Sequence, residues 1–92
     1  MAKDIPELQS ILKTFYEERD WEKFHDPKSL CMALSTEVAE LSEKFQWLTQ
    51  EQANHIMQTD LRTAEEIRDE MGDVFAYLIT LAAKLNIDLI EV

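Results

Sequence analysis

Two pairs of acidic residues are the side chains in this sequence best suited to bind a metal ion. Glu37 and Glu40 are three residues apart, as are Glu70 and Asp73, and apolar residues flank both pairs at helical spacing. Residues three apart share a helix face, where like charges destabilise the helix by about 0.2–0.5 kcal/mol per pair. An oxygen-preferring divalent cation such as Mg²⁺ removes that repulsion and commonly binds substrate phosphate as well. The spacing therefore predicts a metal site.

Either pair alone is more typical of a solvated helix face, so their combination is what matters. The segment between Glu40 and Glu70 is long enough for one helix to end, a short helix to turn, and the next helix to return antiparallel. The two pairs can then face each other, as inward-facing acids do in metal-binding helical bundles. Glu66 and Asp69 add to this acidic run, and we interpret Glu66 as a helix cap and Asp69 as solvated.

The apolar periodicity predicts an all-α fold, a helical bundle in a single domain covering residues 1–92. We expect helices over about residues 4–19, 28–47, 49–57 and 63–85. Thr49 with Gln52, and Thr63 with Glu66, fit capping boxes for the last two helices. The expected core residues are Leu8, Ile11, Leu12, Phe15, Tyr16, Leu30, Leu34, Val38, Leu41, Phe45, Leu48, Ile67, Met71, Val74, Leu78, Leu81 and Leu85. Asn86 is the expected stop of the last helix.

Length and charge limit the classes of partner. A chain of 92 residues with 46% hydrophobic residues buries limited surface alone, so we expect its core to be completed in a homodimer or a homotetramer. The formal net charge of -10 leaves no basic surface for polymeric nucleic acid or for an anionic membrane. A small phosphorylated ligand remains compatible, because a bound metal reverses the local sign of an acidic cleft.

The cysteine count and the N-terminus favour a cytoplasmic protein. Cys31 is the single cysteine and lies in an apolar run, so we expect a buried thiol. With only His25 and His55 beside it, Cys and His cannot assemble a structural zinc site. Residues 1–9 contain no apolar signal segment, and no apolar run approaches the roughly 20 residues that span a bilayer.

Five segments together resemble the all-α nucleoside triphosphate pyrophosphohydrolases, which comprise MazG-like enzymes and their dCTP pyrophosphatase relatives. The segments cover nearly the whole chain. They are Arg-Asp-Trp-x-x-Phe-His-x-Pro at 19–27, Glu-Val-Ala-Glu-Leu at 37–41, Phe-Gln-Trp at 45–47, Glu-x-x-Asp-Val-x-x-Tyr-Leu at 70–78 and Asn-Ile-Asp-Leu at 86–89. The resemblance implies Mg²⁺-dependent hydrolysis of a nucleoside triphosphate, such as dCTP or a modified deoxynucleotide, to the monophosphate and pyrophosphate. This reaction would clear unwanted nucleotides from the cellular pool.

The resemblance also implies roles for individual residues. The implied Mg²⁺ ligands are Glu37, Glu40, Glu70 and Asp73, and Glu40 would orient the attacking water. The implied nucleoside contacts are Trp21, Phe24, His25, Trp47 and Tyr77, and Lys28 and Lys44 would meet phosphate. Four of these contacts have a specific structural alternative: Phe24 as a core residue, Tyr77 as an interface tyrosine, His25 as a loop or cap residue, and Lys44 as the partner of Glu40.

Two other hypotheses stay open. Related chains continue past the Asp-Leu segment with a further helix that closes the substrate pocket, whereas this sequence stops at Val92. We therefore expect either an incomplete chain or a reduced site, which would make the protein a degenerate homologue that binds nucleotides without cleaving them. The second alternative is a non-catalytic helical oligomerisation module whose acids bind a metal structurally.

Overall fold

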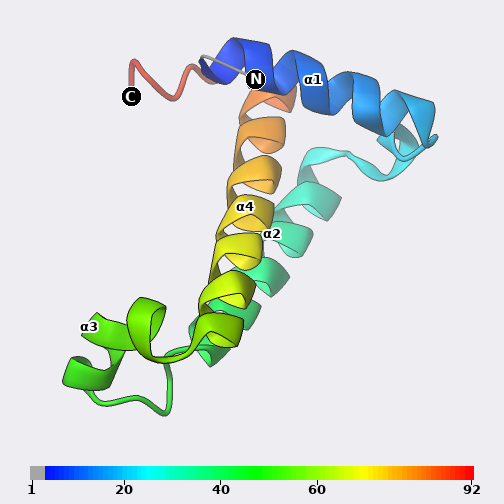
Figure 1. The fold of residues 1–92 in the computed structure, drawn as a ribbon. Coiled ribbons are helices and arrows are strands. Elements are labelled where there is room, and N and C mark those ends of the chain that lie inside the picture. The colour runs from blue at the N-terminus through cyan, green and yellow to red at the C-terminus, as the bar shows by residue number, and fades with distance from the viewer. Residues whose placement is uncertain (1–3) are drawn as a thin grey trace.

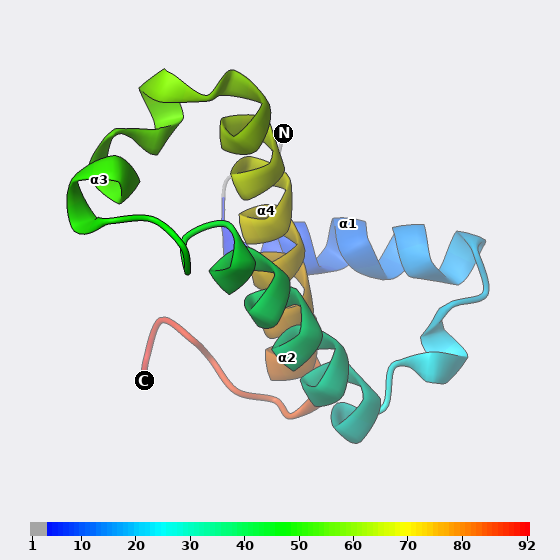
Figure 2. The same cartoon turned by 90° about the horizontal axis from the view of Figure 1, so that it is seen from below.

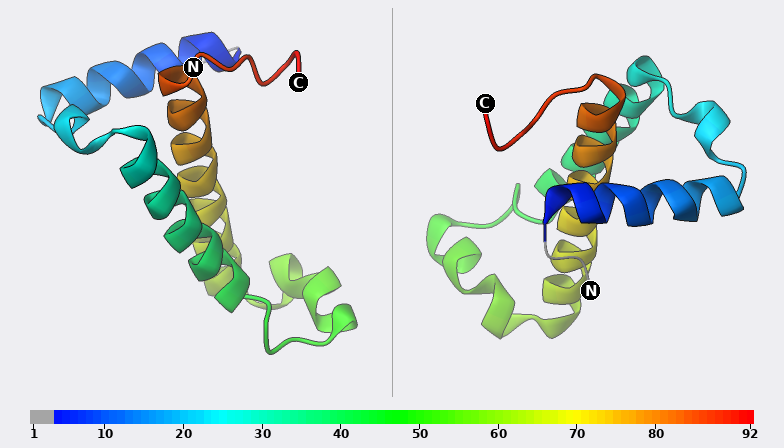
Figure 3. Two further views of the ribbon diagram at one scale, coloured as in Figure 1. Left: turned by 180° about the vertical axis from the view of Figure 1, so that it is seen from behind. Right: turned by 90° about the horizontal axis from the view of Figure 1, so that it is seen from above.

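Two long antiparallel helices form the body of the domain. The computed structural model describes residues 4–92, so the first three residues of the expected domain lie outside the described range. Within that range all regular structure is helical, and α2 (Pro27–Glu43) and α4 (Leu61–Lys84) lie side by side (Figure 1). α1 (Ile5–Glu18) crosses the C-terminal end of α4, and α3 (Gln50–Thr59) packs at its N-terminal end (Figure 2; Figure 3). The all-α prediction is confirmed, and the helices that carry the acidic pairs are neighbours.

Side-chain caps start the helices. The Asp4 carboxylate accepts the backbone N–H of Glu7 at 2.8 Å, and Asp26 caps α2 in the same way. Thr49 and Gln52 form the predicted capping box, with the two side chains bonding each other's backbone N–H at 2.9 and 3.1 Å. Such caps satisfy N–H groups that have no partner inside the helix. They fix where each helix begins.

The predicted start of the last helix at Thr63 is wrong, because Asp60 caps it. The Asp60 carboxylate accepts the Thr63 backbone N–H at 3.1 Å and the Thr63 hydroxyl at 2.7 Å. The Asp60 backbone N–H also donates to Ile56 and closes α3. Asp60 is thus the one residue between the two helices, and Glu66 is free to bond elsewhere.

The two long helices end differently. α2 ends at Glu43, short of the predicted Trp47, and turns lead the chain to α3. α4 ends as expected, because Asn86 adopts the left-handed φ of 55° and the backbone N–H of Ile87 bonds to Ala82 at 2.9 Å. This backbone pattern is the Schellman motif, which asparagine tolerates well.

The core of the single chain is small and is centred on α4. The residues with less than a tenth of their surface exposed are Leu30, Ile56, Ala64, Ile67, Ile79 and Ala82. α1 is attached to this core partly through Gln9, whose side-chain amide donates to the Ile79 carbonyl at 2.8 Å. No helix of the described residues is long and apolar enough to cross a membrane.

Several residues predicted to be buried are exposed in the single chain. Val38, Met71, Leu78 and Leu85 expose 43%, 57%, 39% and 47% of their surface, and Cys31 is also exposed. They lie on helix faces that no other described element of this chain covers. The periodicity identified apolar stripes correctly, but it could not tell a stripe that packs within the chain from one left open.

Candidate metal centre

Glu37 of α2 and Glu70 and Asp73 of α4 come together between the two long helices. One carboxylate oxygen from each residue lies within 4.8 Å of the other two. The antiparallel pairing brings Glu37 to α4, and the three-residue spacing places Glu70 and Asp73 on one side of α4. Glu37 and Glu70 are partly buried and Asp73 is exposed, so this acidic cluster is open to solvent on the Asp73 side.

Two oxygens of the acidic cluster lack a hydrogen-bond donor. Glu37 Oε2 and Glu70 Oε2 are both buried without a partner. Two ionised carboxylates cannot satisfy each other, since each only accepts, and a buried unsatisfied group costs about 1–3 kcal/mol. A proton shared with Glu70, together with burial and the charges of Glu40, Glu70 and Asp73, raises the pKa of Glu37 to about 7. The acidic cluster therefore lacks a positive charge to neutralise its carboxylates.

A hard divalent cation fits this cluster. All three donors are carboxylates, the ligand type that suits Mg²⁺ or Ca²⁺ rather than a soft transition metal. In an Mg²⁺ octahedron adjacent ligands lie about 3 Å apart and opposite ligands about 4.2 Å apart, and the three oxygens within 4.8 Å of one another are near this range. The two donorless oxygens would then have a partner.

Glu40 lies one helical turn from Glu37 but outside the three-residue cluster. Its side chain is exposed, and its charge contributes to the raised pKa of Glu37. The structure therefore brings three of the four predicted ligands together and leaves Glu40 at the edge. An exposed carboxylate at the edge of a metal site can contact water more readily than a buried one.

Lys44 is bound to Glu66, which sequence reasoning had assigned to a helix cap. The Lys44 ammonium lies 2.9 Å from the Glu66 carboxylate, and Arg62 approaches the same carboxylate at 3.5 Å. The hydrogen bond with Glu66 raises the pKa of Lys44, and the charge of Glu70 adds to this effect. Lys44 thus links α2 to α4 beside the acidic cluster, and its partner in the structure is Glu66 rather than Glu40.

An aromatic series extends from the α1–α2 connection. The Trp21 ring meets Phe15 edge-on at 5.8 Å, Phe15 meets Tyr16 at 5.8 Å, and Tyr16 meets His25 at 4.4 Å. Sequence reasoning assigned Phe15 and Tyr16 to the core and so missed their position beside Trp21 and His25. Their helical spacing alone gave no signal of this contact.

Tyr77 lies within electrostatic range of both the aromatic series and the acidic cluster. Burial raises the pKa of Tyr77, and the charges of Glu37, Tyr16 and Asp73 raise it further. Tyr77 therefore lies near both the acids and Tyr16. Its position suits a side chain that contacts a ligand held at the cluster.

The other predicted substrate residues are not assembled in one chain. Trp47 is 87% exposed and follows the C-terminal end of α2, whereas Trp21 precedes its N-terminal end. α2 has 17 residues and is therefore about 25 Å long. Phe24 is 62% exposed rather than a core residue, and Lys28 is exposed in the first turn of α2. One chain alone does not enclose a nucleoside with all five aromatic residues.

The fold and the acidic cluster define a class: all-α domains with carboxylates gathered between two paired helices. The sequence model of the MazG-like family matches residues 32–92, and the chain belongs to this family. The solved structure of a pyrophosphatase from Archaeoglobus fulgidus is similar, with a TM-score of 0.85 and 36% identity. The similarity covers 99% of this chain and 82% of that one.

Named mammalian proteins are also similar to this chain. dCTP pyrophosphatase 1 of Rattus norvegicus is 40% identical over 86 residues, which is 92% of this chain and 49% of the relative. The Homo sapiens protein of the same name is 38% identical over 85 residues, which is 92% of this chain and 49% of the relative. The chain thus spans about half the length of the curated relatives it matches.

Proposed function

We propose that this domain is a metal-dependent nucleoside triphosphate pyrophosphohydrolase. The observation that carries the proposal is the acidic cluster, with two buried carboxylate oxygens that have no donor. The resemblance to proteins named dCTP pyrophosphatase supports dCTP or a related deoxynucleotide as the substrate, and the all-oxygen donor set supports a hard cation such as Mg²⁺ as the metal. The physiological role is removal of unwanted nucleotides from the cytoplasmic pool.

In this proposal the acidic residues have two roles, metal binding and orientation of the attacking water. Glu37, Glu70 and Asp73 would hold Mg²⁺, which when bound would offset the negative charge of the phosphates and lower the pKa of water at the site. Glu40, exposed at the edge, orients the attacking water and accepts its proton on a carboxylate oxygen. The water oxygen bonds to the α-phosphorus, and the bond from this phosphorus to the oxygen bridging toward the β-phosphorus breaks. The products are the nucleoside monophosphate and pyrophosphate.

The nucleoside contacts follow from the positions of the aromatic residues. Tyr77, whose pKa responds to the charges of Glu37 and Asp73, would contact the nucleoside beside the acidic cluster. Trp21, Phe24, His25 and Lys28 lie at the N-terminal end of α2. Base stacking on an aromatic ring contributes about 1–3 kcal/mol per base. Trp47, at the other end of α2, would complete the site from a second copy of the chain.

We also propose that the domain is a homodimer or a dimer of dimers. Met71, Phe75 and Leu78 follow one another on α4 at spacings of four and three residues, and expose 57%, 43% and 39% of their surface. We call these three residues the apolar face. The small core of the single chain supports burial of this face against another copy, because monomers rarely leave a contiguous apolar patch open.

The direct test is an activity assay with Mg²⁺ and each deoxynucleoside triphosphate in turn. Ion-exchange separation of the products should detect monophosphate and pyrophosphate in equal amounts, and Glu40→Gln should abolish turnover without loss of Mg²⁺ binding. Glu51→Gln on α3, an exposed acid distant from the cluster, is the matched control. Intact Mg²⁺ binding without turnover in the unmodified chain would favour the structural-metal or degenerate alternatives.

A further inference from the structure

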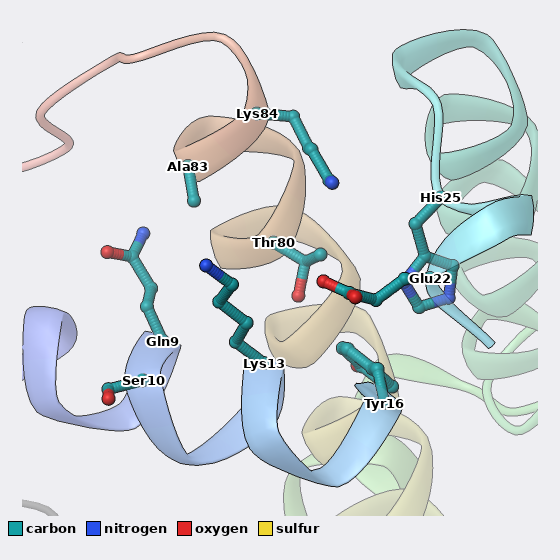
Figure 4. A pocket seen from close by; sticks show the side chains of 9 residues that line it. All are labelled: Gln9, Ser10, Lys13, Tyr16, Glu22, His25, Thr80, Ala83 and Lys84. Carbon is teal, nitrogen blue, oxygen red and sulfur yellow. The ribbon is translucent and has the colours of Figure 1, made fainter. Parts of the chain in front are cut away.

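A cavity lies between α1 and the C-terminal part of α4. Its volume is about 460 Å³, and none of the four predicted metal ligands lines it. Its walls come from α1, from the turn before α2 and from the end of α4 (Figure 4). This cavity is therefore distinct from the acidic cluster, although both sites use α4.

Two lysines from different helices meet at this cavity. Lys13 of α1 and Lys84 in the last turn of α4 both extend into the space between the helices (Figure 4). Lys13 has one weak partner, Glu17 at 4.0 Å, and both side chains of that pair are largely exposed. Lys84 makes no ion pair with any residue from 4 to 92. The chain as a whole has a net charge of -10, yet these two lysines leave positive charge at this cavity.

The remaining polar groups define what this cavity can bind. Glu22 is an acid on the wall opposite the lysines and lowers the local positive charge. Burial, followed by the charge of Lys84, lowers the pKa of His25, while Glu22 opposes this shift. This shift favours the uncharged ring of His25, which can offer a ring N–H. Lys13, Lys84 and Glu22 together carry a net charge of +1.

The backbone spacing of the two lysines is fixed. The Gln9 amide donates to the Ile79 carbonyl at 2.8 Å, and the Thr80 hydroxyl donates to the Ala76 carbonyl at 2.7 Å. The first bond ties α1 to α4 one turn from Lys13 and close to Lys84. The lysine stems thus start from two helices held together, which reduces the ordering cost of binding one anion with both.

We propose that this cavity binds a phosphoryl oxyanion through Lys13 and Lys84. Asp73, Tyr77 and Lys84 follow one another along one side of α4, and Asp73 and Lys84 are about 16 Å apart along the helix axis. The oxyanion is free phosphate or pyrophosphate, because a nucleoside triphosphate held by its phosphates at the acidic cluster carries no second phosphoryl group at this distance. Binding of the free anion does not rest on the proposed function.

The test measures binding of inorganic pyrophosphate to the whole chain by isothermal titration calorimetry in EDTA, so that the acidic cluster is without metal. We expect binding that Lys84→Gln and Lys13→Gln each weaken about tenfold, because each removes a charge-assisted hydrogen bond. Glu22→Gln should strengthen binding, since it removes the opposing charge. Arg68→Gln, which removes a positive charge from an exposed position on α4 outside the cavity, should change the affinity less than twofold.

Three results would overturn the proposal: no pyrophosphate binding without metal, equal weakening by Arg68→Gln and Lys84→Gln, or no effect of either lysine variant. Kinetics with dCTP give a second readout. Lys84→Gln should leave KM for dCTP unchanged and remove the effect of added phosphate on the rate, whereas a raised KM for dCTP would place Lys84 in the nucleotide site and overturn the proposal. The calorimetry needs no turnover, so a failed activity assay leaves this test intact.

Discussion

The two sides of α4 expose opposite chemistry. Met71 and Asp73 are two residues apart, which places them about 200° apart around the helix. On one side Asp73 and Glu70 gather with Glu37 of α2, and on the other Met71, Phe75 and Leu78 form the apolar face. One helix therefore serves two surfaces, one suited to a cation and one suited to another protein. This division explains why the single chain has so small a core.

The largest expected effect comes from removing a ligand on the acidic side. Glu70→Gln should lower Mg²⁺-dependent turnover about 100-fold or more, because the metal supplies several kcal/mol of charge stabilisation and each 1.36 kcal/mol is about tenfold. Steady-state assays of dCTP hydrolysis measure this loss. Self-association, measured by analytical ultracentrifugation, should stay unchanged. A coupled loss of both would show that the two sides are not independent.

The reciprocal change is a charge on the apolar face. Met71→Glu should weaken self-association about 30-fold or more, since a charge placed in an apolar interface typically costs at least about 2 kcal/mol. Met32→Glu on α2 is the control, because Met32 is 63% exposed and lies outside the apolar face. Analytical ultracentrifugation over a concentration series compares the two. If Met71→Glu and Met32→Glu self-associate equally strongly, the apolar face is not part of the interface.

The acidic side should also make metal-free stability depend on pH. The pKa of Glu37 is about 7 in the folded chain against an ordinary value of 4.5, so the folded state holds a proton that the unfolded state releases. Stability from this group is complete below pH 4.5 and is lost as the pH rises through 7. The Tm in EDTA should therefore fall between pH 5 and pH 8. In Glu37→Gln this part of the fall should be absent.

The smallest effect concerns the ion pair at the edge of the acidic side. Lys44→Gln should lower the free energy of unfolding only slightly, because the pair with Glu66 is partly exposed and solvent screens it. Urea denaturation measures this change, with Lys23→Gln as a control for an exposed pair. A rise in KM for dCTP in Lys44→Gln at unchanged stability would instead assign Lys44 to phosphate.

Much of the fold followed from local sequence signals. The Thr49–Gln52 cap, the Asn86 stop and the antiparallel approach of Glu37 to Glu70 and Asp73 depend on spacing within one or two helices, which a sequence displays directly. The start of α4 was missed because Asp60 and Thr63 both fit a cap, and only the actual hydrogen bonds distinguish them. The end of α2 was placed late because the apolar pattern continues into the following turns.

The site was less predictable where it depends on how helices cross. Nothing in the spacing of Tyr16, Lys13 or Lys84 indicates that α1 meets the end of α4. The cavity between these helices could therefore not be predicted from the sequence. The exposure of Met71 and Leu78 was missed for a related reason. Periodicity identifies a stripe, whereas burial depends on which element covers it, and that element need not belong to the same chain.

The single-residue connection at Asp60 has a consequence for local opening. Its backbone N–H closes α3 while its carboxylate starts α4, so fraying of either helix end displaces the residue that caps the other. Amide hydrogen exchange in the last turn of α3 and the first turn of α4 should therefore share one opening free energy. These two turns would behave as a single cooperative unit, unlike an ordinary pair of helix termini that open separately.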